Sequence, residues 1–370
     1  MLKQISAVLV PSTKADAGAV WHYGDPFGEQ RAAKNNSVII DRSHSNILLI
    51  TGKDRRYWLN SISSQYVSDL SNSMVTENLI LSHHGHIENH WTQTELDKTI
   101  YLKTEPWKGT HLLNYLNKMI FWADIRVRFA NMSVLSLLGP GIADSSVLKA
   151  IGIEKLPNKS KALQLSKGGL VWRLPGKNIR LDIIVPRNMS VEYIKKITKT
   201  GVRPAGIWTY ESIRVESKYP RLNLDADKRT IPHELNWIGI AGRGAVHINK
   251  GCYKGQETVA RVHNLGKSPR MLVILHLAVN ANEYPTSGDL IKAKNYIVGR
   301  IGTVVEHFLY GPIALALIKT GIHPDTQLFT GVNFKTQAKI DLDTLPKIDH
   351  TAGLGRIAIQ KLRKSRQKEK

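Results

Sequence analysis

The C-terminal third of the chain differs in pattern from the rest, and this contrast most constrains the fold. From about residue 270 onward, short apolar runs alternate with Gly and Pro, as in RMLVILHLAV, IVGRIGTVVEH and PIALALIK, and no long helical period occurs. Many short strands separated by turn residues are typical of a small closed β structure. We therefore predict a separate C-terminal β-barrel domain over residues 269–345.

The region before the barrel, residues 1–268, mixes both periodicities. Residues 47–49 predict a strand, and residues 54–70 predict a helix that opens at Asp54. The runs NLILS, GHIENHWTQ, TIYLKT, DIRVRFA, MSVLSLLG, GLVWRLP and IRLDIIV predict further strands. PWKGTHLLNYLNKMIFW predicts a helix that starts at Pro106, and ADSSVLKAI and SVEYIKKITKT predict two more. The pattern indicates an α+β class with helices packed on sheets.

Composition limits the environment and the partners. The chain has 370 residues, of which 42% are hydrophobic, enough for two or three folded domains. One cysteine excludes an intrachain disulfide, a cysteine-rich zinc site and a self-sufficient iron–sulfur cluster, so we expect a reducing compartment. The start has too short an apolar run for a secretion signal, and no run reaches membrane-spanning length. We therefore expect a cytoplasmic protein with no membrane partner.

The charge balance calls for an anionic partner. The formal net charge is +22, which favours a nucleic acid, a polyanionic cofactor or an acidic protein surface. The last ten residues, KLRKSRQKEK, carry six basic side chains. We predict that residues 346–370 form a basic, disordered tail.

The richest chemical motif surrounds the single thiol. In KGCYKGQETVARVHN, Cys252 lies between Gly251 and Gly255 and close to two lysines, just before a predicted helix. Positive neighbours and a nearby helix N-terminus favour the thiolate, and the glycines let the backbone present the sulfur. The alternative is that Cys252 is a small buried apolar residue. The loop-like, cationic surroundings favour a reactive, catalytic cysteine.

This motif also carries a family resemblance. KGCYKGQE resembles the signature of the YgfZ group of folate-binding proteins, relatives of the aminomethyltransferase (T protein) of the glycine cleavage system. DRS, ILLITGKDRRYWLNSISSQYVSDL, LSHHGHIENH, YESIRVESKYPRLNLD and IPHELNW are similar to other elements of that family and occur in the same order. The resemblance covers about residues 38–335 and implies a GcvT-like region of two interleaved α+β subdomains plus the barrel, around a central hole. It also implies a tetrahydrofolate or another reduced folate as cofactor.

The resemblance, together with the chemistry of folate, indicates the binding residues. Glu216 in IRVESK matches the glutamate that holds the pterin in the transferases, and a carboxylate can accept both hydrogen bonds of the pterin donor edge. Alternatively, Glu216 is a surface carboxylate that pairs with Arg214 or Lys218. The aromatic rings of the same predicted helix offer an apolar slot or belong to the core. The candidate cofactor-binding residues are Glu216, Trp208, Tyr210, Lys250, Tyr253, Lys254, Gln256, Glu257 and Arg261.

The hairpin LSHHGHIENH raises two further questions. Its histidines invite a metal site, but strand alternation would place His86 and His90 about 13 Å apart, so we expect no metal. The transferases carry an aspartate beside the reactive folate nitrogen, where this chain has Glu88, Asn89 and His90. This departure argues against aminomethyl transfer unless Glu88 substitutes.

Three functions follow in order of preference. The first is an accessory protein that supports iron–sulfur cluster synthesis or repair in client enzymes through Cys252. The second is a folate-dependent one-carbon transferase or demethylase. The third is an RNA-binding protein that acts on tRNA, which rests on the net charge and the basic tail.

Overall fold

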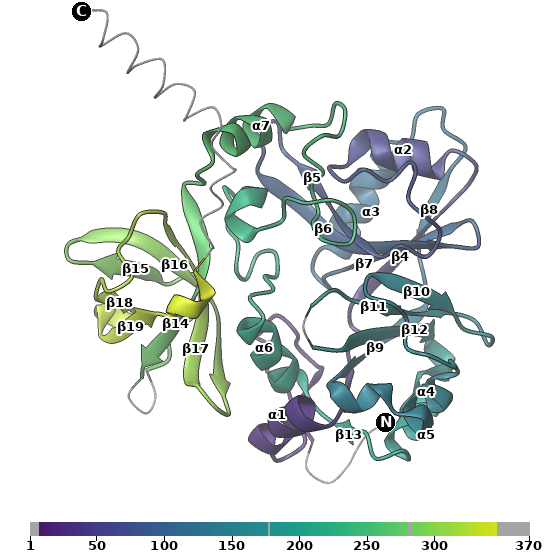
Figure 1. Ribbon diagram of the computed structural model, residues 1–370, viewed down its shortest axis with the longest axis horizontal. Coiled ribbons are helices and arrows are strands. Elements are labelled where there is room, and N and C mark those ends of the chain that lie inside the picture. The colour runs from purple at the N-terminus through teal and green to yellow at the C-terminus, as the bar shows by residue number, and fades with distance from the viewer. Residues whose placement is uncertain (1–6, 177, 280–282, 346–370) are drawn as a thin grey trace, which may run out of the picture.

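The computed structural model describes residues 7–176, 178–279 and 283–345, which form two α+β halves and a β-barrel (Figure 1). The predicted basic tail, residues 346–370, lies outside the described residues. Within the described ranges, no helix combines the length and the apolar character that crossing a bilayer requires.

The first half is a five-stranded antiparallel sheet of order β5-β6-β7-β4-β8. Its strands are β4 (Asn46–Thr51), β5 (Thr76–Leu81), β6 (Ile87–Leu96), β7 (Thr99–Thr104) and β8 (Arg126–Phe129). The helices α2 (Arg55–Ile62) and α3 (Gly109–Lys118) cover one face. There, Trp58 and Leu112 pack with Trp91 of the sheet in one apolar cluster.

The second half is a six-stranded sheet of order β10-β11-β12-β9-β3-β13. Its strands are β3 (Val38–Asp41), β9 (Met132–Leu138), β10 (Lys161–Gln164), β11 (Leu170–Arg173), β12 (Arg180–Pro186) and β13 (Arg203–Pro204). β3 precedes the whole five-stranded sheet in the chain and β9 follows it, yet the two strands pair antiparallel from Val38↔Leu138 to Asp41↔Leu135. The first half is therefore inserted into the second, which confirms the predicted interleaving.

The two sheets pack face to face. Leu49 of the first sheet joins Trp172 and Ile184 of the second in a shared buried cluster. The helices α4 (Ser145–Ile151) and α5 (Ser190–Thr198) cover the outer face of the second sheet. Four layers result, helix, sheet, sheet and helix, because each sheet has one apolar face toward the other and one toward its helices.

The C-terminal strands close into a six-stranded barrel of order β14-β17-β16-β15-β18-β19. The strands are β14 (Arg270–Ala278), β15 (Leu290–Ala293), β16 (Tyr296–His307), β17 (Gly311–Lys319), β18 (Leu328–Thr330) and β19 (Thr336–Ile340). Val273, Leu275 and Ile291 belong to its buried core. The predicted α+β class with a C-terminal barrel is thereby confirmed.

Two helices line the space between the barrel and the second half, and a third lies above them (Figure 1). The helices are α1 (Pro26–Asn35), α6 (Ile207–Glu216) and α7 (Gln256–Leu265). A short ribbon of β1 (Val8–Leu9) and β2 (Val20–His22) packs beside α6. Buried Arg214 of α6 binds Glu211 and Asp225 at 2.7 and 2.8 Å and reaches Thr303 of the barrel. This buried network fixes α6 against the barrel.

Two predicted helices have different bounds in the structure. The helix from Asp54 ends at Ile62, because Ser63 is extended and the Asn60 side chain accepts the Val67 amide instead of continuing the helix. The helix predicted from Pro106 begins at Gly109, since the Asn46 side-chain amide donates a hydrogen bond to the Pro106 carbonyl at 2.8 Å. Both changes arise from side-chain hydrogen bonds that helical periodicity does not record.

Candidate functional site

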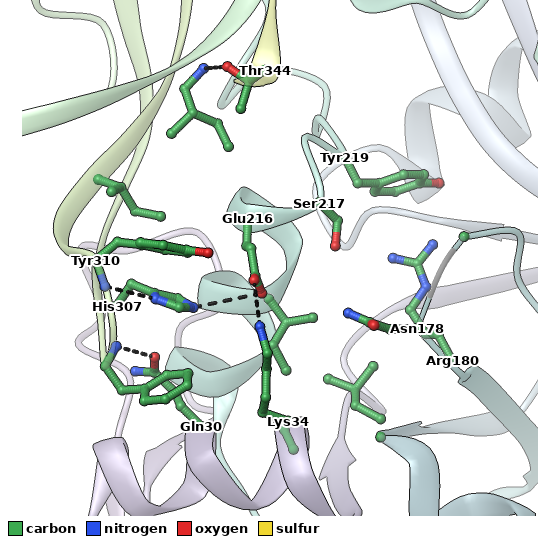
Figure 2. Close-up of a pocket in the computed structure, with 18 of the residues that line it drawn as sticks. Gln30, Lys34, Asn178, Arg180, Glu216, Ser217, Tyr219, His307, Tyr310 and Thr344 are labelled. Carbon is green, nitrogen blue, oxygen red and sulfur yellow. Dashed lines mark hydrogen bonds and ion pairs between the residues drawn. The ribbon is translucent and has the colours of Figure 1, made fainter. Parts of the chain in front are cut away.

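A cavity of about 770 Å³ lies where α1, α6, the second sheet and the barrel meet (Figure 2). A volume of this size suits a small organic ligand. The docking of the barrel on α1 shapes one wall: Gln30 donates to the Glu306 carbonyl at 3.1 Å and accepts from the Phe308 amide at 2.9 Å. These contacts fix the β16–β17 turn, which carries His307 and Tyr310.

Glu216, the last residue of α6, faces this cavity (Figure 2). Lys34 Nζ of α1 lies 3.1 Å from its Oε1, and His307 Nε2 of the barrel lies 3.7 Å from its Oε2. The hydrogen bond with His307 and then the ammonium of Lys34 hold the pKa of Glu216 below its ordinary value, against the opposing effect of burial. Glu216 is therefore a fixed, ionised acceptor whose side chain is 20% exposed.

Polar and aromatic groups complete the wall of the cavity. Tyr310 stacks on His307 with ring centroids 4.8 Å apart, which presents a flat surface beside Glu216. On the opposite side, the Arg180 guanidinium lies 4.6 Å over the Tyr219 ring, and its Nε has no hydrogen-bond partner within the described residues (Figure 2). The cavity thus combines an anion at one wall and a cation at the other, with aromatic rings beside each (Figure 2).

A small polar chamber adjoins the cavity, because Arg180 and Tyr219 line both. Arg42 of the DRS motif is buried there, 3.8 Å over the Tyr210 ring, with Nε and Nη1 unpartnered among the described residues. His90 also lines the chamber, at 3.0 Å from Glu77. The chamber thus adds hydrogen-bond donors next to the cavity.

The two aromatic candidates of α6 lie outside the main cavity. Tyr210 lines the small chamber, under Arg42. Trp208 contacts the barrel and the N-terminal ribbon: its Nε1 donates to the Glu306 carbonyl at 3.1 Å, and its ring lies 5.4 Å from that of Trp21. Trp208 thus helps to dock the barrel turn, whereas Tyr210 lies next to the space that Glu216 faces.

The signature loop lies elsewhere, before α7, and none of its residues lines the cavity of Glu216. Cys252 is exposed on this loop. Lys250 is buried and donates to the carbonyls of Asn60 and Ser63 at the end of α2, and burial lowers its pKa to about 8. The structure thus does not bring the thiol and Glu216 together in one cavity.

The other signature residues support the loop or face solvent. Gln256 donates to the Lys250 carbonyl at 3.2 Å, and Lys254 pairs with Glu88 at 3.3 Å. Tyr253 is buried, which raises the pKa of its hydroxyl to about 12. Glu257 and Arg261 are exposed on α7. Gly255 has a φ of +82°, and a Cβ there would lie 2.5 Å from the Ser82 carbonyl, so the motif requires glycine for close contact with the β5–β6 turn.

The β5–β6 hairpin adopts the predicted strand form, and its polar residues diverge. Glu88 faces Lys254, Asn89 Oδ1 lies 3.0 Å from His111 Nδ1, and His90 stacks on Trp237 with centroids 4.3 Å apart. The carboxylate of Glu88 does not line the cavity of Glu216. No group of three or more His, Cys, Asp or Glu side chains in the described ranges is placed to hold a metal ion.

Sequence analysis did not identify several residues of the cavity, notably Lys34, His307, Tyr310 and Arg180. They come from α1, β12 and the barrel, and no local motif connects them. Arg42 had a signal, because it belongs to the DRS element that entered the resemblance.

The chain has relatives among characterised proteins, although no protein-family model matches it. It is 30% identical to the tRNA-modifying protein YgfZ of Aliivibrio fischeri over 164 residues, 43% of this chain and 47% of that protein. It is 22% identical to the YgfZ of Vibrio vulnificus over 316 residues, 81% of this chain and 90% of that protein. It is 21% identical to an aminomethyltransferase of Chromobacterium violaceum over 235 residues, 58% and 62% of the two chains.

These matches differ in how much of each relative they span. Alignments to a chloroplastic protein of Arabidopsis thaliana and to two bacterial YgfZ proteins span 66%, 47% and 60% of those proteins' own length. In the solved structures, the aminomethyltransferase of the Bartonella henselae glycine cleavage system matches with a TM-score of 0.77 and 17% identity, and 90% of this chain and 92% of that chain are covered. This similarity concerns the fold.

Two interleaved α+β halves and a barrel, joined around a polar cavity, define the aminomethyltransferase class of fold. Within that class, the sequence matches include several proteins named YgfZ. The chain is thus similar in sequence to YgfZ proteins and to an aminomethyltransferase, in agreement with the resemblance of its signature motif.

Proposed function

We propose that this chain is a folate-binding accessory protein of the YgfZ type, in which the cavity beside Glu216 binds the pterin of a reduced folate. The observation that carries this proposal is the ionised carboxylate of Glu216 on the wall of a cavity of about 770 Å³. The 2-amino group and the ring N–H of a pterin form a paired donor edge that such a carboxylate accepts.

The neighbours of Glu216 support this role. Lys34 and His307 each contact one carboxylate oxygen, so the side chain is oriented before a ligand arrives and its remaining lone pairs stay available. Tyr310 offers a flat face to a ring. Arg180 is a cation for the anionic glutamate tail of folate, and its buried Nε has no hydrogen-bond partner among the described residues.

We propose that Cys252 acts on a partner protein rather than on the bound folate. Its thiol is exposed, and it lies outside the cavity of Glu216. Two contacts hold the loop in place. The Lys250 ammonium binds the end of α2, and the Gln256 side chain donates to the Lys250 carbonyl. A single thiol cannot complete an iron–sulfur cluster, so the client enzyme would supply the other ligands during synthesis or repair.

Aminomethyl transfer is less well supported. It would require an anion near the reactive folate nitrogen, and Glu88, the candidate for that role, pairs with Lys254 on the side of the signature loop. Formation of methylene-tetrahydrofolate from an amine donor by the purified chain would establish this transferase activity and contradict the accessory role that we propose.

RNA binding is a second candidate because bacterial relatives are named tRNA-modifying proteins and this chain has a net charge of +22. Cations contribute to RNA affinity in a salt-dependent way. The expected sign is a steep loss of RNA affinity with rising salt concentration.

The decisive experiment for the folate proposal is a crystal structure of the full chain with tetrahydrofolate, combined with a calorimetric titration. We expect the pterin at Glu216 and the glutamate tail toward Arg180. A folate bound elsewhere, or no binding at millimolar concentration, would refute the proposal.

A further inference from the structure

Two aromatic side chains are exposed to an unusual degree at the outer edge of the first half. Phe121 and Trp122 follow α3, and they are 76% and 97% exposed. Neither belongs to a buried cluster of the described residues. Because burial of an aromatic ring is strongly favourable, a pair of rings left in solvent calls for an explanation beyond folding.

The loop that carries these rings is held at both ends by α2. On one side the Trp58 indole donates to the Met119 carbonyl at 2.9 Å. On the other side the Asp54 carboxylate accepts from the Asp124 amide at 2.7 Å. Phe121 and Trp122 therefore project from a fixed base. Binding to them costs little additional ordering of the chain.

A third ring and three cations surround this loop. Tyr57 is 78% exposed and lies three residues after Asp54, on the same side of α2 as that residue. Lys53 directly precedes Asp54, and Lys118 directly precedes Met119. Arg126 begins β8, two residues after Asp124. All three cations are exposed, and none has an ion pair within the described ranges. Of the two carboxylates that neighbour them in the sequence, Asp54 accepts the Asp124 amide, and Asp124 is exposed.

We propose that this surface, which consists of Tyr57, Phe121 and Trp122 with Lys53, Lys118 and Arg126, binds an unpaired segment of RNA. Unstacked bases pack on exposed aromatic faces, and neighbouring cations contact the phosphates between them. These six residues come from two segments that are far apart in the chain, residues 53–57 and 118–126. The fold brings them to one edge.

RNA fits this surface better than a membrane does. The aliphatic neighbours Met119, Ile120 and Ile125 pack against the core. The exposed apolar groups are therefore separate aromatic rings and not a continuous apolar surface. A membrane-binding surface needs such a continuous apolar face. This inference rests on the RNA-binding candidate and not on the folate proposal, because α2 and β8 lie at the edge of the molecule remote from the barrel (Figure 1).

The test measures binding of a fluorescently labelled, unstructured RNA oligonucleotide to the full chain by anisotropy. We expect Trp122→Ala to weaken binding by about tenfold or more, the scale of one lost base–aromatic stack, and Trp122→Phe to retain most of the affinity. Lys53→Gln and Arg126→Gln should each reduce the slope of log affinity against log salt by about one. Tyr296→Ala is the matched control, because Tyr296 is 75% exposed on the barrel and should not affect binding.

Several outcomes would overturn the proposal. One is equal RNA affinity in the original chain and in Trp122→Ala, when thermal unfolding curves show that both proteins are folded. Another is a chain truncated after residue 360 that loses all RNA affinity, which would assign binding to the tail. A third is the absence of RNA binding, together with co-sedimentation of the chain with anionic phospholipid vesicles that is lost in Trp122→Ala. Tetrahydrofolate titration of Trp122→Ala should match the original chain, so failure here is distinct from failure of the folate proposal.

Discussion

Lys34 Nζ and Glu216 Oε1 lie 3.1 Å apart, although 182 positions separate the two residues in the chain. The contact joins α1 to the end of α6 at the wall of the central cavity. Together with His307 from the barrel, Lys34 keeps the carboxylate ionised. The charge of the proposed pterin acceptor therefore depends on α1 and the barrel as well as on α6.

Replacement of Glu216 should reduce folate affinity. We expect Glu216→Ala to weaken tetrahydrofolate binding by about 1.5–3 kcal/mol, the cost of losing hydrogen bonds to a charged group. Isothermal titration calorimetry measures this change. Glu192→Ala is the control, because Glu192 is an exposed surface carboxylate that pairs with Lys196. An unchanged affinity in Glu216→Ala would remove Glu216 from the site.

The pH dependence of folate binding should report the influence of Lys34 on Glu216. The pKa of Glu216 lies below its ordinary value of 4.5, so the carboxylate stays charged and affinity should be level from neutral pH down to that range. Protonation removes the acceptor, and affinity should then fall. In Lys34→Met the pKa rises, so the loss should begin at a higher pH. Titrations across pH measure both curves, and identical onsets in the two proteins would contradict the role of Lys34.

The single thiol should be required for function and not for folding. Cys252→Ser removes an exposed atom, so we expect an unchanged unfolding temperature and unchanged tetrahydrofolate affinity. Support of iron–sulfur enzymes should be lost when this variant replaces the protein in a deletion strain. Enzyme activity in extracts measures the effect. Full complementation by Cys252→Ser would show that the thiol has no such role.

The buried arginine of α6 should dominate the stability of the domain interface. Arg214→Met leaves Asp225 buried without its cation and Glu211 with Arg221 alone, which costs about 3–5 kcal/mol of unfolding free energy. Denaturant unfolding followed by circular dichroism measures this loss. Arg261→Met is the control, since Arg261 is exposed on α7 and its replacement should change the free energy of unfolding little. Equal stability of the two variants would contradict this assignment.

Local patterns were sufficient for the elements and for the class of fold. Strand alternation after residue 270 predicted the barrel, and the signature loop and α6 carried the family resemblance. The predicted helix bounds at Ile62 and Gly109 were wrong because, at each, a side chain forms a hydrogen bond with a backbone group outside the regular helix. Helical period and turn chemistry depend on neighbours in sequence, so they can be predicted from the sequence.

The sequence by itself determined the alternation of strands and helices, the separate barrel, the lone thiol in a glycine-rich loop and the carboxylate at the end of α6. Only the tertiary structure decided which side chains surround that carboxylate, and that the thiol lies outside its cavity. The physical reason is that a cavity is bounded by segments that meet only after the sheets, α6 and the barrel have packed. Its charge and shape therefore depend on contacts between distant segments, which no local period records.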